Sequence, residues 1–215
     1  IIRFIWISDR RKPKDLPGLV KAAAEARQEF PEFLVGLDLA GDESIGEPEA
    51  QPSEIAPFFT PVFEACLPIT IHAGEGKTAQ NIWEAAYHLH ADRIGHGLTL
   101  NDHPDLLKRF IDRKICLELC PTSNREVVGY HDPKYPNSHN LPIYPLRQLW
   151  QAGLPLTLCT DNPGISRTTL ADEYLAAARM IGELSLWDCL AMIKQAYQNA
   201  FASSSTREKL LKESD

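Results

Sequence analysis

Residues 68–97 read PITIHAGEGKTAQNIWEAAYHLHADRIGHG. The β-branched run at 69–72 predicts a strand, and the GEG triplet at 74–76 ends it. The segment 78–91, which follows a possible cap at Thr78, has apolar residues at helical spacing, and a short strand is predicted at 93–95. This stretch is therefore one strand–loop–helix–strand unit, with His72 and Glu75 on the loop that leaves its first strand.

The same alternation runs along the whole chain. Strands are predicted near 3–8, 34–39, 69–72, 93–95, 115–120 and 156–160, with helices near 16–30, 52–67, 78–91, 103–114, 144–153, 168–181 and 185–202. The segment 124–140 is predicted to be a long polar loop that covers a site, and residues after 204 a frayed tail. Repeated strand–helix units indicate a parallel α/β sheet with helices outside it.

Polar residues end nearly every strand. They are Asp38, His72, His96, Ser123 and Asp161. In a (β/α)8 barrel of the TIM type, all strand C-terminal ends meet on one face, whereas a doubly wound sheet gathers them only at its switch point. Because five strand ends carry such residues, the barrel is favoured, with about six of its strands recognisable here.

Composition narrows the class of protein. The 215 residues are 44% hydrophobic, enough for one globular domain over 1–215, and the net charge of −7 argues against nucleic acid or an anionic membrane as partner. No membrane-length apolar run or signal-peptide pattern is recognised. Five cysteines without a CxxC pair fit reduced thiols in a cytoplasmic protein.

Three strand ends combine into a possible metal site. Imidazoles such as His72 and His96 and a carboxylate such as Asp161 suit zinc, and an adjacent glutamate such as Glu75 is placed to move protons. Taken singly, each histidine could be structural, Asp161 a turn or cap residue and Glu75 a solvated loop charge. Their shared position at strand ends favours metal-assisted hydrolysis, with Asp161 holding the hydroxide.

Five motifs carry a resemblance to a known family. DLAGDE (38–43), IHAGE (71–75), RIGHG (93–97), CPTSN (120–124) and CTDNPGIS (159–166) resemble, in order and spacing, the signatures of the adenosine deaminase family. The resemblance implies a zinc-containing barrel, one zinc ion per site, and replacement of the 6-amino group of a purine nucleoside by oxygen.

The resemblance also implies roles for individual residues. His72 and Asp161 would be zinc ligands, Glu75 would protonate the purine N1, and His96 would orient the hydroxide and stabilise the developing charge. Gly41 would offer its backbone N–H to a ring nitrogen of the purine. Asn162 stands where many family members have aspartate, beside the imidazole part of the purine, so it is expected to shift substrate choice.

One family feature is not found. The family takes its first two zinc ligands from an HxH motif far upstream of DLAG, but here the HxH is at His88 and His90, within the predicted helix. Residues two apart on a helix point about 200° from each other and cannot share a metal. The chain is thus expected to match the C-terminal portion of the barrel, strands three to eight, and to need an N-terminal segment to complete it.

Several readings of the activity stay open at this point. They are an adenosine deaminase, a sister enzyme acting on adenine or a modified adenosine, and a non-catalytic barrel remnant used for binding. Without further ligands, the 215 residues alone are expected to bind zinc poorly, to associate through open strand edges and to lack deaminase activity.

Overall fold

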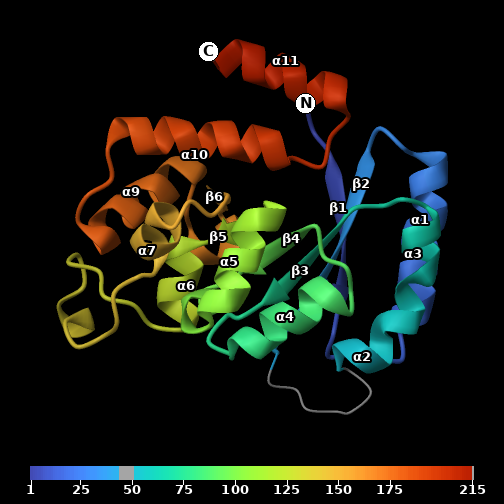
Figure 1. Ribbon diagram of the computed structural model, residues 1–215, viewed down its shortest axis with the longest axis horizontal. Coiled ribbons are helices and arrows are strands. Elements are labelled where there is room, and N and C mark those ends of the chain that lie inside the picture. Colours follow the sequence, from blue (N-terminus) through green and yellow to red (C-terminus); the bar gives the residue numbers. More distant parts are fainter. Residues whose placement is uncertain (44–50, 215) are drawn as a thin grey trace. The chain divides into compact units, whose positions relative to one another are not determined.

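The computed structural model describes residues 1–43 and 51–214, drawn as a coloured ribbon in Figure 1. The chain divides into two compact units, 1–95 and 96–215. The strands within the described residues number six, and each lies within two residues of its predicted bounds. No helix among the described residues is both long and apolar enough to cross a bilayer.

The first unit contains consecutive sheet neighbours. These are β1 (Phe4–Asp9), β2 (Leu34–Ala40), β3 (Ile69–Ala73) and β4 (Arg93–His96), whose last residue begins the second unit. β1 and β2 are parallel with Ile7 opposite Asp38, and β2 and β3 are parallel with Asp38 opposite Thr70. Every residue of β2 is buried, as expected for a parallel strand flanked by others and covered by helices.

The helices of the first unit are α1 (Leu16–Glu29), α2 (Pro52–Ile55), α3 (Thr60–Glu64) and α4 (Ala79–Tyr87), with a 3₁₀ turn η2 (Ala56–Phe59). α1 and α3 lie side by side (Figure 1). The single helix predicted at 52–67 is thus three short pieces, because Pro57 and Pro61 lack the N–H that a continuous helix needs. The core of this unit includes Leu16, Val20, Leu37, Leu39, Phe59, Val62, Ile69 and Ile71.

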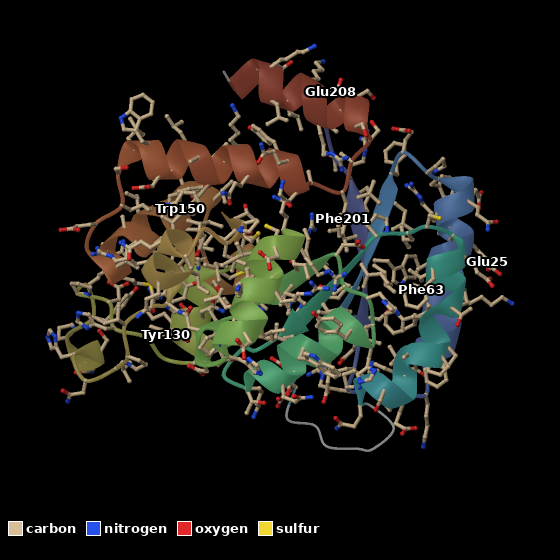
Figure 2. All side chains as sticks on the ribbon, viewed as in Figure 1. Glu25, Phe63, Tyr130, Trp150, Phe201 and Glu208 are labelled. Carbon is tan, nitrogen blue, oxygen red and sulfur yellow. The ribbon has the colours of Figure 1, made fainter. Side chains whose placement is uncertain are left out.

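The second unit contains the parallel pair β5 (Cys116–Leu119) and β6 (Leu156–Leu158), with Leu117 opposite Leu156. Its helices are α5 (Pro104–Arg113), α6 (Pro121–Val127), α7 (Leu146–Gln151), α8 (Pro163–Ser166), α9 (Leu170–Ile181), α10 (Leu186–Asn199) and α11 (Ser204–Ser214), with 3₁₀ turns η3 (Leu100–Asp102) and η4 (Pro136–Ser138). α10 packs on β6, and Trp150 of α7 donates to Asp188 of α10 at 2.9 Å (Figure 2).

Three predicted boundaries were wrong. The helix α6 was not predicted, and it includes residues 124–127 of the predicted loop; Pro121 opens it, a position where its missing N–H costs nothing. The tail after 204 is helical, not frayed. The helix predicted over 78–91 ends at Tyr87, and His90 lies beyond it with a φ of 53°.

Candidate active site

His72 lies at the end of β3, beside the end of β2. Its Nδ1 is 3.0 Å from Oδ1 of Asp38, whose side chain is only 11% exposed. A carboxylate only accepts hydrogen bonds, so it holds the imidazole proton on Nδ1 and leaves the lone pair on Nε2. Gly95 on β4 makes room for this ring, because a Cβ there would lie 3.1 Å from His72 Nδ1.

A buried arginine supports the same strand ends. Arg10, 8% exposed, donates to the backbone carbonyls of Leu39 and His72. Burial lowers the pKa of Arg10, and the nearby carboxylates of Glu43 and Asp38 oppose that shift. Arg10 therefore fixes the carboxyl ends of β2 and β3 relative to each other.

Glu43 holds the loop that carries Glu75. Its carboxylate accepts from the backbone N–H of Gly74 at 2.9 Å and of Glu75 at 2.8 Å, and from the side-chain amide of Asn81 at 2.9 Å. These bonds join the DLAGDE motif to the IHAGE motif and to the start of α4. Glu75 itself is partly exposed. The backbone of this loop is consequently preorganised around the predicted acid.

Gly41 lies at a position where no side chain fits. Its φ is 99°, and a Cβ there would lie 2.6 Å from Oδ1 of Asp9. Only glycine tolerates that combination. The close backbone turn is compatible with the role expected for its N–H.

The remaining predicted residues lie in the second unit. His96, 1% exposed, has Nδ1 at 2.9 Å from the side-chain amide nitrogen of Asn124. The amide oxygen of Asn124 accepts from the Tyr144 hydroxyl at 2.9 Å and from the backbone N–H of Cys120 at 3.1 Å. Burial raises the pKa of the Tyr144 hydroxyl and of the Cys120 thiol well above their usual ranges, so both keep their protons.

Asp161 is held from both sides. Oδ2 accepts from the Ser123 hydroxyl at 2.7 Å, and Oδ1 accepts from the side-chain amide of Asn162 at 3.1 Å. Asp161 has a φ of 53° and His96 a φ of 64°, a region that residues other than glycine seldom occupy. Such backbone strain gathers at functional sites, which favours function over the turn or cap role for Asp161.

The first turn of α6 organises the second unit. Thr122, Ser123 and Asn124 are consecutive, and they contact Glu173, Asp161 and His96 respectively. Glu173 of α9, fully buried, accepts from the Thr122 backbone N–H at 2.9 Å and from the Thr168 hydroxyl. One helical turn thereby positions both predicted catalytic side chains of this unit.

His88 and His90 do not form a metal pair, although the reason differs from the predicted one. Both lie beyond the end of α4, and each ring packs on a different aromatic side chain, His88 on Trp83 and His90 on Phe63, which Figure 2 labels. Within neither unit do the described residues gather three His, Cys, Asp or Glu side chains around a common point.

Sequence reasoning did not assign roles to Arg10, Glu43, Asn124, Tyr144 and Glu173. Glu43 lies in the DLAGDE motif and Asn124 in the CPTSN motif, so membership of a quoted motif was the available signal. Arg10, Tyr144 and Glu173 had no such signal, because nothing local marks a buried partner that lies far along the chain.

The family profile described as Adenosine deaminase matches residues 2–215. The chain belongs to the adenosine deaminase family. One similar protein is an adenine deaminase of Sinorhizobium fredii, which is 35% identical over 90% of this chain and 56% of the relative. An adenosine deaminase of Clostridium acetobutylicum is 32% identical over 86% of this chain and 52% of the relative.

A solved structure extends the comparison. The apo N6-methyl-AMP deaminase of Arabidopsis thaliana superposes with a TM-score of 0.79 at 29% identity, covering 99% of this chain and 58% of that one. The predicted fold class, a parallel α/β barrel seen in part, is confirmed. The family member described here spans about half the length of the curated relatives it matches.

Proposed function

We propose that this chain is the catalytic part of a zinc-dependent aminohydrolase that replaces the 6-amino group of a purine by oxygen. The observation that carries the proposal is the joint placement of an oriented imidazole and an acid. His72 is bonded to Asp38, and the neighbouring Glu75 sits on a loop whose backbone N–H groups bind Glu43. An ordinary loop charge needs no such support.

The donors fit a zinc ion. His72 offers Nε2 because Asp38 occupies Nδ1, the outer-sphere arrangement usual for zinc-bound histidine. Asp161 offers a carboxylate oriented by Ser123 and Asn162. A bound zinc ion would supply hydroxide at neutral pH by lowering the pKa of a coordinated water.

The chain's own residues would do the rest. Glu75 gives a proton to N1 of the purine, which makes C6 more electrophilic. As a carboxylate it then takes the proton from the oxygen that has added to C6 and passes it to the leaving amine. His96 and Asp161 orient the attacking oxygen, and the His96 ring stabilises the charge that develops as this oxygen adds to C6. Gly41 donates its backbone N–H to the purine ring, and Asn162 contacts its five-membered part. We propose that residues 1–215 belong to one catalytic domain and that these groups act on the same substrate.

The substrate is proposed as a 6-aminopurine, with adenosine and adenine as the two candidates. Relatives named for each are about equally similar to this chain, at 32% and 35% identity. One spectrophotometric assay separates these specificities: zinc-loaded protein, prepared with any flanking sequence that its gene encodes, is tested on adenosine, adenine and N6-methyl-AMP. No turnover of any of the three, with neither ammonia released from adenosine or adenine nor methylamine from N6-methyl-AMP, would contradict the proposal.

Glu75→Gln tests the mechanism. The protein is prepared with any flanking sequence that its gene encodes, and zinc is measured by elemental analysis. Glutamine cannot transfer the proton, so we expect normal zinc content and a rate lowered on the order of 10²–10⁴-fold. Glu64→Gln, an exposed site on α3, is the matched control and should change neither. Near-normal turnover of the Glu75 variant would remove Glu75 from the acid role.

A further inference from the structure

Two facts about Asn124 define a hydrogen-bond direction. Asn124 is fully buried, and its amide nitrogen, not its oxygen, faces Nδ1 of His96 at 2.9 Å. An amide nitrogen carries two N–H donors and no acceptor. The ring nitrogen that receives this bond must therefore present its lone pair.

The amide cannot be turned around without loss. Its oxygen faces the backbone N–H of Cys120, a group that can only donate, at 3.1 Å. The same oxygen accepts from Tyr144, which is itself fully buried and packed edge-on against Tyr130 with ring centroids 5.1 Å apart (Figure 2 labels Tyr130). Flipping the amide would set its N–H₂ against the Cys120 N–H in a buried site, which costs more than losing the bond.

We infer that Asn124 is a positioning residue that holds His96 as the neutral tautomer with its proton on Nε2. Neutral imidazole has one protonated and one bare nitrogen, so a bare Nδ1 puts the proton on Nε2. The ring then offers a hydrogen-bond donor at Nε2. Its value to catalysis rests on the proposed function, because a donor is what an attacking oxygen and a developing negative charge require. The tautomer itself rests only on the geometry.

The substitution Asn124→Asp reverses the direction of the hydrogen bond between residue 124 and Nδ1 of His96. Aspartate has nearly the same shape, and one carboxylate oxygen can still accept from Cys120 and Tyr144. The other oxygen faces Nδ1 and can only accept, so it requires a proton on Nδ1. His96 should then switch to carrying its proton on Nδ1. Asn101→Asp is the matched control: it makes the same change at a surface asparagine that donates to Gln148.

The tautomer is read directly from ring nitrogen shifts. Protein labelled with ¹⁵N-histidine, with the His96 signals assigned by their loss in His96→Gln, gives long-range ¹H–¹⁵N spectra in the absence of added zinc. We expect a protonated Nε2 in the parent protein and in Asn101→Asp, and a protonated Nδ1 in Asn124→Asp. A protonated Nδ1 in the parent protein overturns the inference, and so does an unchanged pattern in Asn124→Asp. If that variant does not fold, the parent spectrum decides.

Kinetics separate this inference from the proposed function. With 6-aminopurine turnover established, Asn124→Asp should lower kcat on the order of 10²–10⁴-fold, the range for a misprotonated catalytic group, with KM little changed. If Asn124→Asp switches the His96 tautomer but does not lower kcat, Asn124 does position the His96 ring, and the catalytic role proposed for His96 is contradicted. An inactive parent protein with Nε2 protonated contradicts the proposed function alone.

Discussion

Two histidines of the same chain are set to opposite tautomers by their neighbours. Asp38 is an acceptor and places the proton of His72 on Nδ1, whereas the amide of Asn124 is a donor and places the proton of His96 on Nε2. The first arrangement leaves a lone pair on Nε2 of His72, which suits a metal, and the second leaves an N–H on Nε2 of His96, which suits an oxyanion. One carboxylate and one amide thus assign different chemistry to identical side chains.

Asp38→Asn tests the first of these assignments. The amide can present its N–H₂ to Nδ1, which favours a proton on Nε2, where the zinc would bind. We expect zinc affinity, measured by chelator competition, to fall on the order of 10–100-fold. Asp15→Asn is a suitable control, because Asp15 is exposed and its side chain does not cap α1. Equal affinity in the Asp38 variant and the parent protein would show that Asp38 does not orient a ligand.

At the scale of elements, α6 and α9 are joined through Glu173. This buried carboxylate satisfies one backbone and one hydroxyl donor on different segments. It therefore holds the first turn of α6, which contacts His96 and Asp161, against the segment that follows Asp161.

Glu173→Ala removes the acceptor of the Thr122 N–H and leaves the Thr168 hydroxyl only its longer contact with the backbone oxygen of Thr169, at 3.3 Å. It should lower the free energy of unfolding by about 1–3 kcal/mol. Glu173→Gln should cost less, because the Thr168 hydroxyl can rotate and accept from the new amide while the remaining oxygen still serves Thr122. Urea unfolding measures both variants, and Glu183→Ala, with an 84% exposed side chain, is the control. Equal losses for alanine and glutamine would argue against this hydrogen-bond geometry.

The segment between α6 and α7 is ordered by a buried ion cluster. Asp132, with a fully buried side chain, pairs with Arg125 at 3.2 Å and Arg179 at 3.1 Å, and accepts from the backbone N–H of Lys134 at 3.0 Å. The predicted loop over 124–140 begins within α6, which ends at Val127, and it contains the 3₁₀ turn η4. Its polar composition gave no sign of the cluster. Whether the loop covers a site stays a prediction.

Asp132 makes the free energy of unfolding depend on pH in the acid range. Burial alone would raise its pKa, but hydrogen bonds from Arg179, Lys134 and Arg125 outweigh burial and hold the pKa below its usual value. A lowered pKa means that the stabilisation is complete above the unfolded value, about 3.9, and is lost as pH falls through the folded value. In unfolding measurements from about pH 6 to 3, Asp132→Asn should be less stable than the parent protein at pH 6 and show a shallower acid decline. Asp112→Asn, exposed on α5, should behave like the parent protein.

At the scale of the whole molecule, the strand β1 pairs with β2 on one side, and on its other side no strand of the described residues pairs with it. Among the described strands its ladder partner is β2, and its side chains Phe4 and Ile7 are 58% and 63% exposed. An apolar strand edge of this kind pairs with other chains. The 215 residues expressed alone should therefore self-associate.

Ile7→Lys tests that expectation. A charge on the edge strand should shift the 215-residue chain toward monomer in light scattering after size exclusion. Ile143→Lys makes the same change at a 58% exposed isoleucine outside the sheet and should not. A parent chain that is monomeric at high concentration would contradict association through β1. We also expect this preparation to bind zinc poorly and to lack turnover, since His72 and Asp161 are fewer ligands than catalytic zinc sites usually have.

The sequence by itself determined the six strands, the barrel class, the family and the residues proposed for chemistry, because these depend on local periodicity, strand-end polarity and short motifs. It misplaced the end of α4, beyond which His90 has a left-handed backbone, and it did not predict α6, which Pro121 opens. Only the tertiary structure decided which hydrogen-bond partners orient those residues and fix their proton positions. Asp38 and His72 are 34 residues apart, and His96 and Asn124 are 28 apart. Proton positions on an imidazole depend on the donor or acceptor opposite each nitrogen, and folding alone brings that group there.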